Sequence, residues 1–242
     1  MAQLRGSVRL LVAIGLSIGL VAVACGTSGA GQSPQDSGAS KPSVGTNGSS
    51  LPAGLSANLD SLTSYQFTET LAGAASTAVP APSGGYRIGG TVVNTPTQSY
   101  WVTASGGAQY TVVGSQAWTT YDGITWIAFD ASDMTLAGLL PGGNYDTWFD
   151  AYAPYFKSQG EESKNGIECI HYQGDSSLAS HYSATAATFK LTADLWVARD
   201  GNYPVSGTFG LAGSFGVGFD ITHVNDASNK ISPPANVVSI PS

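Results

Sequence analysis

The sequence predicts a mainly β domain of the α+β class, built around an antiparallel sheet with a few short helices. Three observations support this prediction. Short segments rich in β-branched and aromatic residues follow one another, glycine-containing turns separate them, and two short apolar segments interrupt the series once. Turns such as Asp122-Gly123 favour tight hairpins, and tight hairpins join antiparallel neighbours.

The N-terminus carries an apolar run, Leu10–Ala24, whose one polar side chain is Ser17 and which has no charge. Arg5 and Arg9 precede the run. A membrane-spanning helix needs about 20 apolar residues, so this shorter run with basic residues before it is typical of a secretory leader. We therefore expect residues 1–24 to be a signal peptide.

Cys25 follows the run directly, after Ala22-Val23-Ala24. A cysteine after small residues resembles a bacterial lipobox, in which Cys25 is lipidated and becomes the first residue of the mature protein. A lipobox prefers Leu three positions before the cysteine, where this chain has Ala22, and the same three residues form an A-x-A site for ordinary signal peptidase. The main expectation is a protein on the outer face of the bacterial cell membrane, anchored through a lipid on Cys25; plain secretion and an uncleaved anchor stay open.

The residues after Cys25 form a tether that leads into one domain. Gly26–Ser50 contains no aromatic residue and one branched aliphatic, Val44, which is typical of a flexible linker. We expect residues 25–50 to be the lipidated cysteine with its tether and residues 51–242 to be a single β domain. Cleavage of the leader removes two arginines and changes the net charge from −7 to −9, which argues against nucleic acid as a partner.

The first half of the domain predicts one short helix and then a meander of strands. Leu55, Leu59 and Leu62 recur at helical spacing. Short β-rich runs follow, separated by turns such as Gly106-Gly107 and Asp122-Gly123. The expected strands are Tyr65–Leu71, Tyr86–Val93, Gln98–Ala104, Gln109–Val113, Gln116–Tyr121 and Ile124–Phe129.

The middle of the domain breaks this pattern. One short helix is expected from an N-cap at Ser132 or Asp133 up to Pro141-Gly142-Gly143, and a second over Asp146–Tyr152, ending at Pro154. Both segments carry more apolar surface than they can bury in themselves, so they have to cover one face of the sheet.

Strands resume after these helices. The expected strands are Ile167–Tyr172, Ala193–Arg199, Tyr203–Leu211 and Phe215–Val224. The last shows the clearest alternation, with Phe215, Val217, Phe219 and Ile221 on one face. From Asp226 onward the tail is expected to be turn-like, with Pro233-Pro234 ending regular structure.

The order of these parts resembles the LolA/LolB-like lipoprotein carriers, particularly the LppX/LprG branch of lipid-binding lipoproteins. The resemblance spans roughly Leu51–Pro234 and rests on four stretches: Val113–Trp118, Asn165–Tyr172, Leu195–Gly201 with Pro204-Val205, and Ile231–Pro234. It implies a curved antiparallel half-barrel of about 10–11 strands, with helices covering its concave face and an apolar cavity between them. The implied ligand is a lipid or another apolar molecule, carried without covalent chemistry. An envelope transporter or an acceptor lipoprotein is a possible partner.

Nine residues are candidates for contact with such a ligand. The cover supplies Leu136, Leu140, Trp148, Phe149 and Tyr152, and the sheet supplies Trp118, Trp126, Gly216 and Gly218. The tryptophans are explained better as core residues than as cavity lining. Strand bending alone suffices to explain the glycines, and room for an acyl chain is the alternative.

A search for catalytic chemistry finds no constellation. His171, His181 and His223 lie far apart, without H-E-x-x-H, and the chain has no G-x-S-x-G. Cys169 stands two residues before His171, but a buried small thiol explains it better than a nucleophile, and it has no disulfide partner if Cys25 is lipidated. We expect no enzyme activity, no metal, no cofactor and a monomer. Two classes are left: a lipid carrier, and an envelope sensor or scaffold whose sheet is filled by its own side chains.

Anchoring can be tested by changing Cys25. If Cys25 is lipidated, Cys25→Ala should release the protein from membranes or leave it unprocessed. Mass spectrometry of the wild-type mature N-terminus should find a diacylglyceryl mass, because one acyl chain alone gives only marginal membrane binding. An unmodified Cys25 on a soluble mature protein would contradict the prediction.

Overall fold

The computed structural model describes residues 50–73, 85–133, 151–175, 177–182, 191–211 and 215–238. The chain divides into two compact units, Met1–Gly45 and Thr46–Ser242, and the described residues all belong to the second. The expected signal peptide, Cys25 and most of the tether lie outside the described residues, so the domain boundaries stay predictions.

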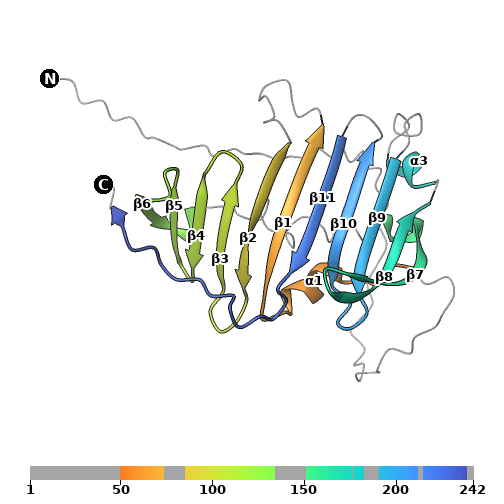
Figure 1. Cartoon of the computed structure of the whole chain (residues 1–242), viewed down its shortest axis with the longest axis horizontal. Helices are drawn as coiled ribbons and strands as arrows, with labels where there is room; N and C mark the ends of the chain where they lie inside the picture. Colours follow the sequence, from red (N-terminus) through yellow and green to blue (C-terminus); the bar gives the residue numbers. More distant parts are fainter. Residues whose placement is uncertain are drawn as a thin grey trace, which may run out of the picture. The chain divides into compact units, whose positions relative to one another are not determined.

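The domain is one twelve-stranded open sheet made of two antiparallel meanders (Figure 1). The first meander consists of β1 (Ser64–Gly73), β2 (Tyr86–Val93), β3 (Ser99–Ala104), β4 (Gln109–Val113), β5 (Gln116–Thr120) and β6 (Trp126–Asp130). The second consists of β7 (Phe156–Lys164), β8 (Ile167–Gly174), β9 (Leu191–Ala198), β10 (Pro204–Leu211) and β11 (Phe215–Thr222). The strand order is β12-β6-β5-β4-β3-β2-β1-β11-β10-β9-β8-β7, where β12 is Val237–Val238.

One pairing joins the two meanders. β1 lies antiparallel to β11 over eight register pairs, from Gln66 opposite Thr222 to Gly73 opposite Phe215. The other neighbouring strands, apart from the pair β12–β6, follow one another in the sequence. The continuous sheet therefore depends on a contact between residues about 150 positions apart in the chain.

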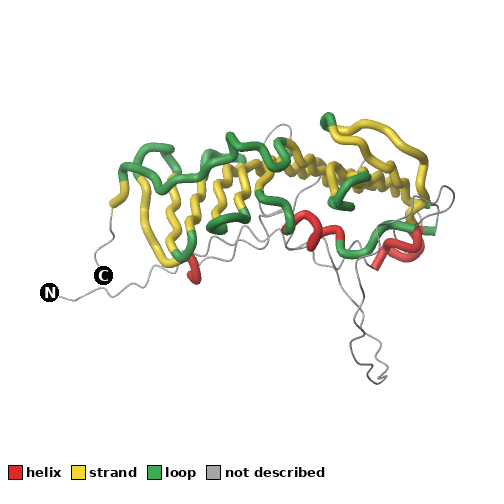
Figure 2. Tube along the Cα trace, turned by 90° about the horizontal axis from the view of Figure 1, so that it is seen from below, coloured by secondary structure: helices red, strands yellow, loops and turns green. Residues whose placement is uncertain are grey.

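The described helices are short and lie on one side of the sheet (Figure 2). They include α1 (Leu55–Asp60), α3 (Leu178–Tyr182) and the 3₁₀ turns η1 (Ala131–Asp133) and η2 (Ala153–Tyr155). We call the side of the sheet under α1 and α3 the helix face and the opposite side the outer face. Successive strand residues point to opposite faces, so the register assigns each strand residue to one of the two.

The hydrophobic core lies on the helix face. Leu55 and Leu59 of α1 are buried against the sheet, and Leu178 of α3 belongs to the same cluster. The strand residues of this cluster that are at most 3% exposed and that the register assigns to the helix face are Tyr65, Phe67, Val92, Val102, Tyr110, Phe156, Tyr172, Ala193, Leu195, Val197, Val205 and Ile221. Cys169 and Ala198 are equally buried members of the cluster that pair with each other and alternate with Ile170 and Val197. The predicted helix at Leu55–Leu62 is thereby confirmed, and its leucine side chains are buried against the sheet.

The C-terminal segment follows the sheet from β11 to β6. Asn229 donates to the Ser64 hydroxyl at 3.0 Å and accepts from the Gln66 amide at 3.1 Å. Further along, the Trp126 backbone N–H donates to the Asn236 carbonyl at 2.9 Å, and Val237–Val238 then pairs parallel with β6. These bonds attach the tail to the start of β1 and to the edge of the first meander.

The predicted fold class is confirmed, and all ten predicted strands exist with ends shifted by at most two residues. Two strands were missed. β7 is polar, with a register shift between Ser158 and Gly160, so it lacks the alternation by which strands are recognised. The tail was wrongly expected to end its regular structure at Pro233-Pro234; β12 follows, and its parallel pairing makes the sheet mixed.

Glycines allow aromatic rings to lie flat on two strands of the helix face. A Cβ added at Gly90 would collide with the Trp101 carbonyl and lie 3.0 Å from the Phe67 ring. A Cβ added at Gly207 would collide with the Phe219 ring and lie 3.3 Å from Leu195. Neighbouring side chains thus already fill the space above both glycines.

Gly207→Ala should therefore lower the free energy of unfolding by about 1–3 kcal/mol, because the Phe219 ring must leave its place. Gly216→Ala is the matched control on the adjacent strand, since the nearest atom to its added Cβ is the Phe209 carbonyl oxygen at 4.0 Å. Urea denaturation should show Gly216→Ala unchanged or slightly more stable. Equal losses in both variants would contradict this description of the core.

Candidate functional site

A row of large apolar side chains crosses the helix face at the end of the sheet opposite α1. The register places Tyr86 of β2 beside Leu71 of β1, Leu71 beside Val217 of β11, and Val217 beside Phe209 of β10. All four are half-buried. We call these four residues the apolar row.

The row differs from the rest of the helix face in its exposure. Nearer to α1, Tyr65, Ile221 and Val205 on the same strands are at most 1% exposed. Helix α1 covers that end, where Asn58 also donates to the Asn202 carbonyl at 3.0 Å. The apolar row thus offers accessible apolar surface next to a closed core.

The helix face of the central strands carries one charge. Of the described residues that β1, β2, β9, β10 and β11 place on this face, Glu69 alone is charged. Glu69 is half-buried, and the register places it between Ile88 of β2 and Phe219 of β11. It lies two residues from Leu71 of the apolar row, on the side toward α1.

The candidate ligand contacts from the sequence do not form one site. Tyr152 is 9% exposed and belongs to the core cluster on the helix face. Leu136, Leu140, Trp148 and Phe149 lie outside the described residues and stay predictions. The four sheet candidates, Trp118, Trp126, Gly216 and Gly218, lie on the outer face.

The register gives the reason for this placement. Trp118 opposes Thr111, which opposes Trp101, and these three alternate with the helix-face residues Ala117, Val112 and Tyr100. Trp126 likewise alternates with Ile127, which pairs with helix-face Thr119. On β11, Gly218 opposes Thr70, and a Cβ there would lie 3.1 Å from the Thr70 hydroxyl. Gly216 and Gly218 therefore lie on the face of the sheet opposite α1 and α3.

The signal for the apolar row was present in the sequence. The alternation in Phe215–Val224 placed Val217 with Phe219 and Ile221 on one face, and that face is the one with the core. The sequence did not indicate how deeply each of these residues is buried. Val217 is half-buried and Ile221 is fully buried, and this difference depends on where α1 ends.

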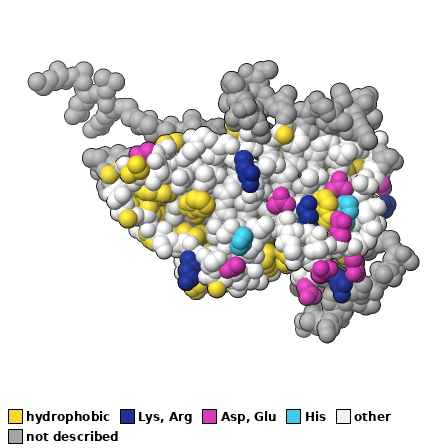
Figure 3. All heavy atoms as spheres, viewed as in Figure 1, with side chains coloured by type: hydrophobic (Ala, Val, Ile, Leu, Met, Phe, Trp, Pro, Cys, Tyr) yellow, Lys and Arg dark blue, Asp and Glu magenta, His cyan; other side chains and the backbone are white. Residues whose placement is uncertain are grey.

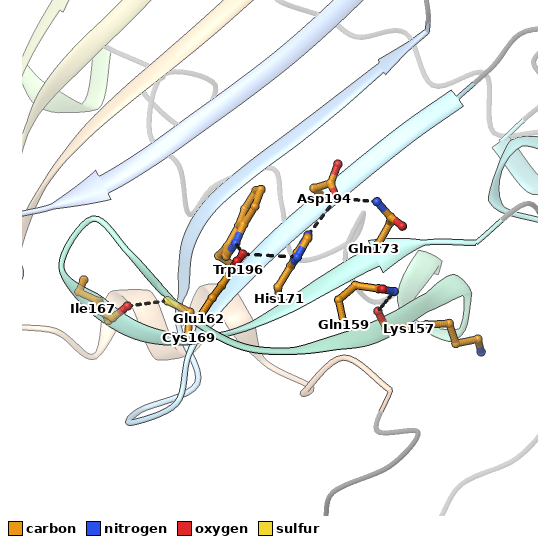
Figure 4. Close-up of polar contacts among 9 residues, drawn as sticks. All are labelled: Lys157, Gln159, Glu162, Ile167, Cys169, His171, Gln173, Asp194 and Trp196. Carbon is orange, nitrogen blue, oxygen red and sulfur yellow. Dashed lines mark hydrogen bonds and ion pairs between the residues drawn. The ribbon is translucent and has the colours of Figure 1, made fainter.

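A polar cluster on the outer face was not predicted (Figure 4). His171 of β8 stacks on Trp196 of β9, with ring centroids 4.5 Å apart and 7° between the planes. The His171 Nε2 lies 2.9 Å from an Asp194 carboxylate oxygen, and its Nδ1 lies 3.4 Å from Glu162. The Trp196 indole N–H donates to the same Glu162 carboxylate.

Neighbouring groups complete this polar cluster. The Lys164 ammonium lies 4.2 Å from the centroid of the Trp196 ring, and Gln173 donates to Asp194 at 3.1 Å. In Figure 3 the group is visible over β7–β9, where acidic, basic and histidine side chains surround an apolar one. Asn165, at the tip of the β7–β8 hairpin, donates to the Ile221 carbonyl at 3.1 Å and so reaches β11.

This arrangement is suited to holding the hairpin rather than to chemistry. Both nitrogens of His171 face carboxylates, so neither points at an open position where a substrate or metal could bind. Within the described residues there is no group of three His, Cys, Asp or Glu side chains that could hold a metal ion. The contacts link β7, β8 and β9 across the outer face.

Cys169 is buried in the core, as the sequence predicted. Its side chain is fully inaccessible, and its thiol donates to the Ile167 carbonyl at 3.2 Å. Burial raises the pKa of the Cys169 thiol to about 11. The thiolate needed for nucleophilic attack is therefore scarce at neutral pH.

Comparison with known proteins gives similarity in fold. No protein-family model matches the sequence, and no curated protein matches it. Among solved structures, the lipoprotein LppX of Mycobacterium tuberculosis matches at 16% identity and a TM-score of 0.42, over 72% of this chain and 92% of that chain. LprF of Mycobacterium bovis matches at 13% identity and a TM-score of 0.44, over 75% and 93%. A LolA-superfamily protein of Nitrosomonas europaea matches at 13% identity and a TM-score of 0.25, over 69% and 89%.

The chain is similar to these proteins in fold. These matches include the groups that the sequence resembles. Their identities and TM-scores concern the fold only, and the function of this chain has to follow from its own residues. In the described part of the chain, no helix is long and apolar enough to span a bilayer.

The structural role of the polar cluster can be tested with His171→Ala. The variant loses the stacking on Trp196 and leaves two carboxylates without their shared partner, so the free energy of unfolding should fall by about 1–3 kcal/mol. Gln159→Ala on the neighbouring strand is the control, because this exposed side chain contacts only the local Lys157 carbonyl in a hydrogen bond at 3.3 Å. A loss in His171→Ala no larger than in the control, measured by urea denaturation, would show that the cluster does not hold the hairpin.

Proposed function

We propose that this protein is an extracytoplasmic lipoprotein, anchored through Cys25, that binds a lipid or another apolar molecule on the helix face and carries it without covalent chemistry. The apolar row is the observation that supports this proposal most directly. It is a contiguous strip of large apolar side chains that the described helices leave half-exposed.

The row has the composition expected of a site for an apolar ligand. Such sites are lined mostly by apolar and aromatic side chains, with few polar groups that orient the ligand. Tyr86, Leu71, Val217 and Phe209 supply the apolar strip, and Glu69 supplies the polar group beside it. The segment with Leu136, Leu140, Trp148 and Phe149 is proposed as the cover over this strip.

The ligand proposed is an acyl lipid. The measurements below compare a neutral headgroup with the anionic headgroup of a fatty acid.

The scaffold or sensor function is the second candidate, and one observation favours it. The end of the helix face under α1 is filled by the protein's own side chains, and the Phe67 and Phe219 rings occupy the space above Gly90 and Gly207. If the protein's own side chains also fill the space over the apolar row, the domain has a solid core with no room for a ligand. The experiment below decides between the two candidates.

Two adjacent residues of β1 provide a matched test. Leu71 belongs to the apolar row, whereas Thr70 is exposed on the outer face. Leu71→Gln should weaken binding of a neutral fluorescent acylglycerol about tenfold, because a polar amide replaces apolar contact surface. Thr70→Gln should bind within about twofold of wild type. Displacement of the probe by unlabelled lipid measures both.

Further controls separate binding from folding. A thermal melt of each variant shows whether it is folded, and a fluorescent fatty acid compared with the neutral probe shows which headgroup the site prefers. If wild type binds no apolar probe and yields no lipid on extraction and mass spectrometry, the carrier function is wrong and the scaffold function takes its place.

A further inference from the structure

The most exposed apolar side chains of the described residues gather at one corner of the sheet. Tyr121 and Ile124 flank the β5–β6 turn and are 56% and 67% exposed. Val237 and Val238 of β12 are 40% and 46% exposed and pair with Trp126 and Ile127. We call Tyr121, Ile124, Val237 and Val238 the apolar corner.

The turn that presents Tyr121 and Ile124 is held rigidly by Asp122. Its carboxylate accepts hydrogen bonds from the backbone N–H groups of Thr125 and Ile124 and from the Thr120 hydroxyl, each at 2.8 Å. The Thr120 hydroxyl in turn accepts from the Gly123 N–H at 3.0 Å. Apolar side chains on such a turn cannot fold back into the core, so the turn keeps Ile124 in the solvent.

The surroundings of the corner contain little charge. The sequence has no Lys or Arg between Arg87 and Lys157, a stretch that includes both strands of the β5–β6 hairpin. The hydrogen bonds from Thr125, Ile124 and Thr120 lower the pKa of Asp122 to about 2, so it stays ionised. The described strands at the corner, β3–β6 and β12, therefore carry no cation for anionic lipids or nucleic acids, and Asp122 limits how deeply the turn can enter an apolar phase.

The corner lies at the same end of the sheet as the apolar row. The register runs from Thr120 to Gln109, from Gln109 to Thr103 and from Ala104 to Ile88, next to Tyr86 of the row. Figure 1 shows the β5–β6 turn at the end of the strands away from α1. A surface that meets the corner thus also meets the end of the sheet where the ligand is proposed to bind.

The size and shape of the corner do not suit a protein partner. A stable protein interface buries about 800 Å² on each side, with 20–30 residues per partner. The corner consists of four large side chains, two of them on a protruding turn. A small apolar turn of this size can insert into a lipid bilayer more readily than it can form a protein interface. Tyrosine is also enriched at the membrane–water interface.

We propose that the apolar corner docks shallowly on the surface of a zwitterionic lipid bilayer, with Ile124 and Tyr121 inserted between headgroups. This inference rests on the proposed function, because an apolar ligand has its source or destination in a membrane. Docking at the corner presents the apolar row to that membrane, which the flexible tether alone does not do.

A fluorophore at position 124 tests the docking in the full chain. Ile124→Cys is prepared in a Cys25→Ser background, where the buried Cys169 thiol stays unlabelled, and carries an environment-sensitive dye. The matched control is Ala227→Cys, an exposed position near the start of β1 at the other end of the sheet. Both proteins are mixed with phosphatidylcholine vesicles that contain brominated acyl chains.

The dye at position 124 should shift to shorter wavelength and be quenched at least threefold more strongly than the dye at position 227. The difference should persist in 0.5 M NaCl, because no ion pairs are involved. Adding Tyr121→Ser and Val238→Ser should reduce the quenching at position 124 by at least half. Equal quenching at both positions, a shift that requires anionic lipid and vanishes in salt, or a concentration-dependent shift without vesicles would each overturn the proposal.

The docking test and the lipid-binding test of the proposed function can fail independently of each other. Exposed corner residues do not touch the apolar row, so Ile124→Ser should bind the acylglycerol probe as wild type does. If the unmodified corner does not dock on vesicles while the acylglycerol probe binds, the docking proposal alone is overturned. Docking without any probe binding overturns the carrier function and leaves a membrane-docking scaffold.

Discussion

The pairing of β1 with β11 is the contact on which the rest of the structure depends. Each meander can form from local hairpins, whereas this pairing closes a loop of about 150 residues and brings the two meanders into one sheet. It also places Leu71 beside Val217 and Phe67 beside Ile221. Without it neither the core under α1 nor the apolar row would exist, because both draw their residues from the two meanders.

The two faces of this sheet differ in composition. Successive residues of each strand point alternately to the helix face and to the outer face. On β1, Tyr65, Phe67 and Leu71 point to the helix face, and Gln66 and Thr70 point to the outer face. A shift of one residue in the register would exchange them. The helix face packs under α1 at one end and offers apolar surface at the other, and the outer face is tied together by polar contacts.

The polar contacts keep the ends of the open sheet in place. An open sheet has two edges, and edges are where strands fray or pair with other chains. At one edge the cluster around His171 and Trp196 links β7 and β8 to β9, and β7 itself carries charges. At the other edge β12 covers part of β6.

The sequence by itself determined the strands, because period-two alternation and glycine turns are local signals, and it determined that Cys169 is buried and that α1 packs through Leu55 and Leu59. It did not determine β7 or β12, which pair without any alternation of their own. It also did not determine which face of the sheet the helices cover, so the sequence could not place Trp118 and Gly218, which lie on the outer face. That choice belongs to the tertiary structure, since alternation separates two faces but does not say which one meets a distant helix.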